Sequence, residues 1–307
     1  MSVGFRRFAW HDIEGIARLH RAAEQIDHAG RNGEAISLAQ RWRRPDCDPE
    51  QGCLVADAEG QVVGYALRSA VPGTTQCILD GVVHPAWRRR GIGRSLLQRA
   101  LERARRAGAG SADVRVRSDE PGAEAFCHVV GLTLARTWLR MWLQPLRPPG
   151  FGFPTGYGWR TFRPHADEAL YAQVVNETMA GHWGTGPIAA ERVAQMAAQP
   201  DFEPGNHLFA LYGREVAGVC SARWVRRTVA GRDLVVAHLG PIGVLEVHRG
   251  CGVGRALVAL SLWRCRRERI QAAELDVDEA NAPAIHVYRD CGLEPLFRIL
   301  WYRRELA

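Results

Sequence analysis

The pattern of apolar and polar residues along the chain predicts one series of strands and helices, and that series occurs twice. Alternation predicts half-buried strands, and apolar residues spaced three and four apart predict amphipathic helices. The first copy predicts strand 5–8, helix 12–24, a strand hairpin over 53–70, strand 76–83, helix 93–107, strand 113–117, a helix before Gly131 and strand 134–143. The second copy predicts strand 159–162, helix 167–179, a strand hairpin over 207–225, strand 234–244, helix 254–270, strand 274–278, a helix before Gly292 and strand 296–303. This order predicts an α/β fold of the α+β kind, in which a mixed sheet has helices on both faces.

Matching segments set the register between the two copies. Strand 113–117 corresponds to 274–278 at an offset of 161 residues, whereas upstream Phe5–Phe8 matches Trp159–Phe162 at an offset of 154. The second copy therefore has about seven extra residues, near Arg226–Asp233 in its middle hairpin. Between the copies, 144–158 is rich in proline and glycine, which predicts a linker. We expect two domains, 1–150 and 151–307.

Length and charge narrow the function classes. A chain of 307 residues is too long for one ordinary core, and an apolar fraction of 47% argues against disorder. The net charge is +7, but the arginines are dispersed and no nucleic-acid-binding motif is visible, so a site for a polyanionic small molecule is favoured. All 40 basic residues are arginine, which excludes a Walker A loop and a Schiff-base lysine.

Cysteine spacing and the amino terminus suggest the compartment. None of the eight cysteines forms a CxxC pair, so we expect no zinc ribbon and no metal. There is no apolar leader segment and no apolar run of membrane-spanning length. We therefore expect a cytoplasmic protein with free thiols that binds neither membrane nor nucleic acid.

A short motif, Arg-x-x-Gly-x-Gly, occurs at Arg88–Gly93 and again at Arg249–Gly254, each time between a predicted strand and a predicted helix. Glycines at a helix N-terminus let backbone N–H groups approach an anion, which the helix dipole also favours. The predicted anion-binding residues are Arg88, Arg89, Gly91, Gly93 and Arg94, and Arg249, Gly250, Gly252, Val253, Gly254 and Arg255. A dinucleotide-binding motif would need a third glycine, but Leu96 and Leu257 stand at that position.

Three segments, Val83–Gly93, Val244–Gly254 and Leu275–Leu293, together resemble the GNAT superfamily of N-acetyltransferases. The tandem arrangement is similar to mycothiol synthase and related double-GNAT proteins. The resemblance implies two tandem GNAT domains, acetyl-CoA as donor and the primary amine of a small molecule as acceptor, with direct attack on the thioester. It also implies that the glycine loop binds the CoA pyrophosphate and that the strand before the loop, which ends at Val83 or Val244, pairs with the pantetheine arm.

The resemblance places the family's general acid at Tyr288, where the first copy has Cys127. A phenol with a pKa of about 10 can donate to a leaving thiolate, whereas a cysteine holds its proton about as weakly as the leaving thiol itself. Asn281 fits the family's CoA-contacting asparagine, although a helix N-cap would also explain it.

A histidine is the first candidate for accepting the proton of the amine. His238 lies 11 residues before Arg249, where members of the family often have a carboxylate, and an imidazole suits neutral pH. A structural role for this histidine is the alternative, with Glu246 as the reserve base. At the 161-residue offset, Cys77 takes the position of His238 in the first copy.

We therefore expect a catalytic second domain and a degenerate first domain, with CoA binding by the first left open. Two alternatives to a general small-molecule N-acetyltransferase remain: mycothiol synthase proper, and a non-catalytic acyl-CoA-binding regulatory module. Two fused domains are compatible with either a monomer or a homodimer.

Overall fold

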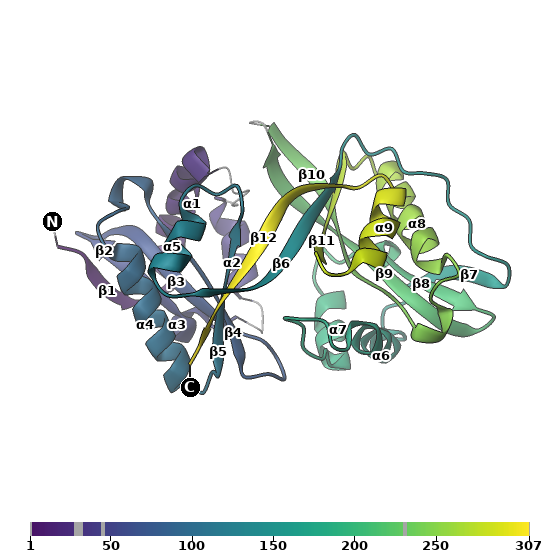
Figure 1. The fold of residues 1–307 in the computed structure, drawn as a ribbon, viewed down its shortest axis with the longest axis horizontal. Coiled ribbons are helices and arrows are strands. Elements are labelled where there is room, and N and C mark those ends of the chain that lie inside the picture. Colours follow the sequence, from purple (N-terminus) through teal and green to yellow (C-terminus); the bar gives the residue numbers. More distant parts are fainter. Residues whose placement is uncertain (1, 28–32, 44–46, 230–231, 307) are drawn as a thin grey trace. The chain divides into compact units, whose positions relative to one another are not determined.

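The structure is a computed structural model that describes residues 2–27, 33–43, 47–229 and 232–306, and its chain forms two compact units (Figure 1). The first unit contains the residues up to Thr137 together with those from Arg298 onward, and the second contains Trp138–Phe297. Each unit is built around one run of six hydrogen-bonded strands.

The strands and helices predicted for the first copy occur in the predicted order, and two further helices, at 35–42 and 49–52, lie between the first helix and the hairpin. The elements of the first unit are β1 (Gly4–Arg7), α1 (Ile13–Asp27), α2 (Ala35–Trp42), α3 (Pro49–Gly52), β2 (Cys53–Ala58), β3 (Gln61–Ala70), β4 (Gln76–Val83), α4 (Ile92–Arg106), β5 (Ser111–Arg117) and α5 (Ala123–Val129). The strands lie in the order β1-β2-β3-β4-β5-β12. Strands β4 and β5 run parallel, and each of the other neighbouring pairs in this order is antiparallel.

The second unit repeats this plan. Its elements are β7 (Tyr157–Thr161), α6 (Glu168–Met179), α7 (Ala190–Ala197), β8 (His207–Tyr212), β9 (Glu215–Val229), β10 (Arg232–Val244), α8 (Val253–Arg267), β11 (Ala272–Asp278) and α9 (Ala282–Asp290). The strands lie in the order β7-β8-β9-β10-β11-β6, with β10 and β11 parallel. The extra residues of this copy lengthen the β9–β10 hairpin, and its tip, 230–231, lies outside the described residues.

The last strand of each copy pairs with a strand of the other copy. Strand β6 (Thr133–Leu143) is antiparallel to β11, and β12 (Glu294–Glu305) is antiparallel to β5. The compact units therefore differ from the division 1–150 and 151–307 by an exchange of strands, similar in principle to domain swapping. The alternating patterns of β6 and β12 predict that each forms a strand. They do not select its partner, because β5 and β11, the fifth strands of the two copies, have similar patterns.

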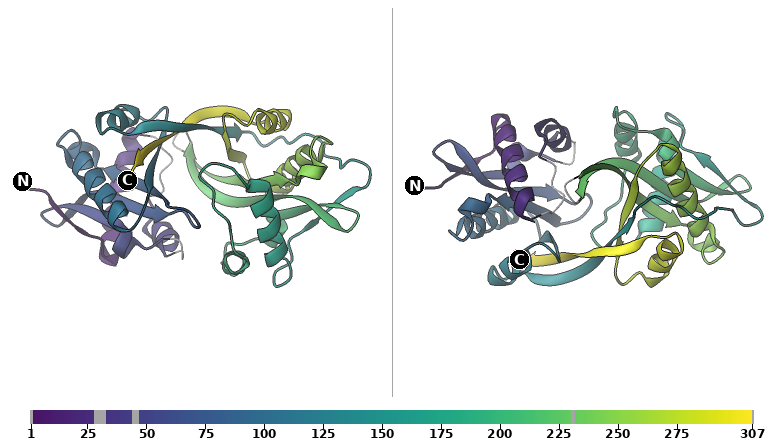
Figure 2. Two further views of the ribbon diagram at one scale, coloured as in Figure 1. Left: turned by 60° about the horizontal axis from the view of Figure 1, so that its bottom comes forward. Right: turned by 90° about the horizontal axis from the view of Figure 1, so that it is seen from above.

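Helices cover both faces of each sheet, as the binary pattern predicts (Figure 2). In the first unit, the apolar side of α4 is buried against one face, and α1 packs against the other. In the second unit, α8 and α6 take the corresponding places. Alternation along a strand separates the two cores: Ala66 of β3 faces α4, whereas Tyr65 faces α1.

The parallel strands of each unit are paired over only part of their length. Residues Gln76–Leu79 of β4 pair with Ser111–Val114 of β5. In the second unit, only Val236–His238 of β10 pair with Ala272–Glu274 of β11. In β10 the register against β9 shifts between Leu239 and Ile242, whereas β4 keeps an unbroken register against β3. A bulge bends the strand that contains it, so β10 leaves β11 directly after His238.

We expect Tyr302→Ala to destabilise the first unit. Tyr302 is fully buried in the core of that unit although its sequence belongs to the second copy, and truncating a large buried aromatic costs about 3–5 kcal/mol. Met141→Ala is the matched control, because Met141 occupies the equivalent position on β6 and is buried in the second unit. Hydrogen exchange should accelerate in α4 for the first variant and in α8 for the second; the reverse assignment would contradict the exchange of strands.

Candidate active site

The glycine loop of the second unit presents backbone donors at the start of α8. Gly250 and Gly252 have φ values of 76° and 90°, the left-handed region that favours glycine, and no side chain caps the helix. The first bond of the helical ladder runs from the Ala256 N–H to the Gly252 oxygen, so the N–H groups before it lack intrahelical acceptors. They include those of Val253, Gly254 and Arg255, which lie at the positive end of the helix dipole, where an anion would be favoured.

Strand β10 and the loop are held together by one arginine and one close packing contact. The Nε of Arg249 donates to the Val244 oxygen at 2.9 Å, while the guanidinium group stays exposed. A Cβ on Gly254 would lie 3.6 Å from Cγ2 of Val244, so the loop packs closely against the end of the strand. Among the described residues, no carboxylate forms an ion pair with Arg249, and its charge is available to a phosphate.

The glycine loop of the first unit has the same backbone shape but a different charge environment. Arg88 Nε donates to the Val83 oxygen at 3.0 Å, and Arg89 and Gly91 have φ values of 62° and 80°. The Arg88 guanidinium, however, forms a bidentate ion pair with the buried Asp27 at 2.7 and 2.6 Å. The 154-residue offset places a glycine, Gly181, at the position of Asp27 in the second copy.

Side chains of α5 lie against the rest of this first loop. A Cβ on Gly93 would lie 3.4 Å from the ring of Phe126, and Arg94 Nη2 donates to the Val129 oxygen at 3.4 Å.

Tyr288, the expected general acid, lies on α9 within the core that includes Val253 at the start of α8. Burial raises the pKa of Tyr288 above its usual value, so the hydroxyl stays protonated. No described residue forms a hydrogen bond with this hydroxyl, which leaves it available to a ligand.

Cys127 takes the place of Tyr288 in the first unit and is fully buried, which raises the pKa of its thiol to about 12. A tyrosine of the other sequence copy also joins this core, which was not predicted. Tyr302 of β12 donates to Glu124 Oε1 at 3.1 Å and lies 3.2 Å from His128 Nε2. No local pattern signals this contact, because it depends on the exchange of strands.

His238 is the last residue of β10 that pairs with β11, and its side chain contacts a cluster of charged residues. Its Nδ1 lies 3.0 Å from Oε1 of Glu274, the residue paired with it on β11. Burial lowers the pKa of His238, and the hydrogen bond to Glu274 opposes that shift. The imidazole is therefore neutral near pH 7. His238 was predicted from the sequence but Glu274 was not, because the pairing of β10 with β11 brings together residues 36 positions apart.

The counterpart of His238 in the first unit is Ile78, and the expected match with Cys77 is wrong. Ile78 pairs with Asp113 on β5 as His238 pairs with Glu274 on β11, and the strands on the other side give the same match. The bulge adds one residue to β10, which changes the offset by one upstream of it. Cys77 lies in the core, where burial raises the pKa of its thiol to about 11.

The two remaining candidates lie at a helix N-cap and in a turn. Asn281 caps α9, because its side-chain oxygen accepts from the Ala284 N–H at 3.2 Å. Glu246 is exposed in the short 3₁₀ turn that follows β10.

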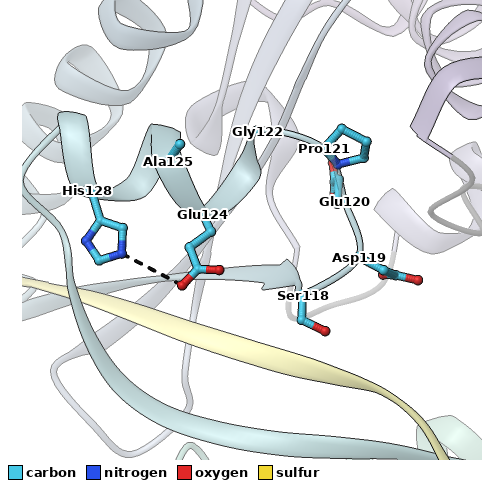
Figure 3. Close-up of a pocket in the computed structure, with 8 residues that line it drawn as sticks. All are labelled: Ser118, Asp119, Glu120, Pro121, Gly122, Glu124, Ala125 and His128. Carbon is cyan, nitrogen blue, oxygen red and sulfur yellow. Dashed lines mark ion pairs between the residues drawn. The ribbon is translucent and has the colours of Figure 1, made fainter.

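A shallow concavity of about 500 Å³ lies between the end of β5 and α5 in the first unit (Figure 3). Its charged lining is mostly acidic, with Glu124 paired to His128 at 3.8 Å and Asp119 paired to Arg117 at 2.6 Å. Such a surface repels a polyanion and does not include the glycine loop. Within the described ranges, no group of three or more His, Cys, Asp or Glu side chains is placed to hold a metal ion. No helix in the same ranges is long and apolar enough to cross a membrane.

Known proteins with similar sequences include several named as acetyltransferases. A mycothiol acetyltransferase from Sanguibacter keddieii is 30% identical over 292 residues, which is 92% of this chain and 89% of that protein. A mycothiol acetyltransferase from Thermomonospora curvata is 29% identical over 288 residues, 91% of this chain and 84% of that protein.

Solved structures share the tandem fold over nearly the whole chain. A GCN5-related N-acetyltransferase from Sphaerobacter thermophilus superposes with a TM-score of 0.79 at 24% identity and covers 99% of this chain and 96% of its own. A tandem GNAT protein from the clavulanic acid biosynthesis pathway gives 0.76 at 23% identity, covering 100% and 99%. The sequence model described as the acetyltransferase (GNAT) family matches residues 15–132 and again 172–293. The chain therefore belongs to the GNAT family of acetyltransferases, enzymes that use acetyl-CoA, and it contains two tandem copies of the fold.

Proposed function

We propose that the second unit transfers an acetyl group from acetyl-CoA to the primary amine of a small molecule, and that the first unit is the degenerate copy. One observation supports this most: only the second unit combines an arginine without an ion-pair partner among the described residues, a histidine where the parallel strands part, and a helix tyrosine. The first unit has Arg88 paired with Asp27, and Ile78 and Cys127 at the other two positions.

The glycine loop accounts for binding of the donor. N–H groups of residues 253–255 and the Arg249 guanidinium would hold the CoA pyrophosphate, and the pantetheine arm would lie along the end of β10 near Val244. The thioester then lies in the opening between β10 and β11, where unpaired strand edges can hydrogen-bond it.

The reaction is a direct displacement. The amine nitrogen attacks the thioester carbonyl, a C–N bond forms, the C–S bond breaks, and the amine loses one proton. We assign that proton to the neutral imidazole of His238 in preference to Glu246, which is exposed in the turn after the strand. The Tyr288 hydroxyl donates to the departing thiolate; because its pKa is raised, proton transfer is completed only as negative charge builds on sulfur.

For the acceptor, we propose the cysteinyl amine precursor of mycothiol as the first compound to test. Relatives named mycothiol acetyltransferase match the chain over nine-tenths of its length, which supports this choice over an unrelated amine. The test is release of CoA and formation of the acetylated product. If a panel of amines gives no CoA release although acetyl-CoA binds, the alternative of an acyl-CoA-binding regulatory module replaces this proposal.

We expect Gly252→Leu to weaken acetyl-CoA binding at least tenfold, because a side chain at a φ of 90° forces the loop to rearrange and obstructs the approach of phosphate. Gly91→Leu is the matched variant, since Gly91 has a φ of 80° and stands at the same point of the first loop. It should spare most of the turnover. Calorimetry and steady-state rates decide, with thermal unfolding to confirm that both variants fold. Loss of turnover in the Gly91 variant alone would show that the active site lies in the first unit.

Tyr288→Phe should lower kcat by about 10²–10⁴, the range of general acid catalysis, with little change in acetyl-CoA affinity. The hydroxyl acts on a charge that develops only as the C–S bond breaks, so binding of the donor does not depend on it. Tyr302→Phe is the control: it removes a buried hydroxyl in the first unit and should leave kcat unchanged. A Tyr288→Phe enzyme with wild-type kcat would refute the assigned role.

The pH dependence of kcat/KM should report His238. The imidazole acts unprotonated, so activity falls as pH drops through its pKa, and burial places that acid limb below the ordinary value of about 6.5. Activity should be flat from about pH 7 upward until another group titrates. In His238→Gln the limb should disappear and the rate should drop, whereas Ile78→Val, at the equivalent position, should preserve both. Persistence of the limb in His238→Gln would assign it to another group.

A further inference from the structure

Glu274 is a carboxylate in the interior of the second unit, with only 1% of its side chain exposed. Both of its oxygens accept hydrogen bonds. Arg140 Nη1 donates to Oε2 at 2.7 Å, Arg227 Nη2 donates to Oε1 at 2.6 Å, and Arg227 Nε also reaches Oε2 at 3.2 Å. His238 Nδ1 completes the set, 3.0 Å from Oε1.

The charges of this cluster balance without a proton on the histidine. Burial opposes ionisation of Glu274, but the hydrogen bond from His238 and the charges of Arg140 and Arg227 hold the pKa of the carboxyl below its usual range. Arg140 also donates to Asp276, at 3.0 Å through Nη2, so two carboxylates face two guanidinium groups. A buried ion set of this kind is stable only when every charge is matched.

An ionised carboxylate can only accept hydrogen bonds, so the Nδ1 of His238 must be the atom that carries the ring proton. The Nε2 atom is then left with its lone pair, the form that an acceptor of a substrate proton requires. The groups facing the imidazole are Glu274 and Asp276 on β11 and Arg223 on β9, with Arg140 and Arg227 behind Glu274.

We propose that Glu274 is a positioning residue that fixes the tautomer and orientation of His238, and that Arg140 and Arg227 keep its carboxylate ionised. The kinetic consequence rests on the proposed function of the second unit. Arg140 comes from β6, so the last strand of the first sequence copy completes the cluster that prepares the second copy's base.

The first unit provides a natural comparison. Asp113 holds the position of Glu274 on β5, is similarly buried, and forms a bidentate pair with Arg303 at 2.7 and 2.9 Å. It pairs across the strands with Ile78, which cannot hydrogen-bond through its side chain. A buried carboxylate paired with arginine from the exchanged strand thus belongs to the scaffold of both units, and only the second unit adds a histidine to it.

The experiment is ¹⁵N NMR of histidine-labelled protein, with His238 assigned from the His238→Gln variant. In the wild type, we expect His238 to be neutral at pH 7 with the proton on Nδ1. Glu274→Gln should populate both tautomers, because an amide can accept from or donate to the ring. Asp113→Asn, the matched variant in the first unit, should leave the His238 signals unchanged. A wild-type proton on Nε2, or an unchanged tautomer in Glu274→Gln, would overturn the proposal.

Kinetics with acetyl-CoA and the cysteinyl amine precursor of mycothiol form the second arm. Glu274→Gln should lower kcat tenfold to a hundredfold while the KM for acetyl-CoA stays constant. Its acid limb should move to lower pH, since the positive charges of Arg140, Arg223 and Arg227 then face the imidazole with one less carboxylate. Asp113→Asn should change neither kcat nor the limb. Equal behaviour of the two variants would mean that Glu274 is merely structural.

A balanced variant covers the case in which Glu274→Gln does not fold. Glu274→Gln combined with Arg227→Gln removes one charge of each sign and leaves the Arg140–Asp276 pair in place. Its tautomer is measured in the same way: a mixture of tautomers supports the positioning role, and an unchanged Nδ1 proton overturns it. If the wild type acetylates no amine, the proposed function fails, and the ¹⁵N measurement alone still decides whether Glu274 positions His238.

Discussion

The pairing of each fifth strand with the last strand of the other copy is the constraint on which both units depend. Strand β12 closes the first sheet and β6 closes the second, so neither sequence copy contains all the strands of its own core. Each exchanged strand also brings a buried side chain and an arginine. Tyr302 fills the core beside Cys127, and Arg303 and Arg140 neutralise the buried carboxylates Asp113 and Glu274. Stability and charge balance in one unit therefore require an intact strand from the other copy.

On this shared scaffold, one inserted residue changes how the parallel strands of the second unit pair. The bulge in β10 ends the pairing with β11 after three residue pairs, whereas β4 and β5 continue for four. His238 is thereby the last residue of β10 that pairs with β11 before the two strands part. Ile78, at the equivalent place, gives the first unit no titratable group there.

The sequence predicted the elements well because they depend on local pattern. Apolar spacing placed α4 and α8 to within a few residues, and the glycine motifs placed both loops at helix starts. Prediction failed where the answer depends on pairing between distant segments. The two fifth strands have similar alternation, so nothing local selects a partner for β6. The contact of His238 with Glu274 also follows from a parallel register, and a constant offset matched His238 with Cys77 because a bulge is invisible to counting.

The electrostatic difference between the two glycine loops follows from the same reasoning. Both loops have backbone donors at a helix start, so shape alone cannot distinguish them. In the first, the ion pair with Asp27 already satisfies the Arg88 guanidinium, and an incoming phosphate would have to compete with a buried carboxylate. Removing that partner would leave the carboxylate buried and unpaired, which is costly. Arg249 meets no such competitor among the described residues. The unit whose glycine-loop arginine has no ion-pair partner among the described residues is therefore also the unit that contains His238 and Tyr288.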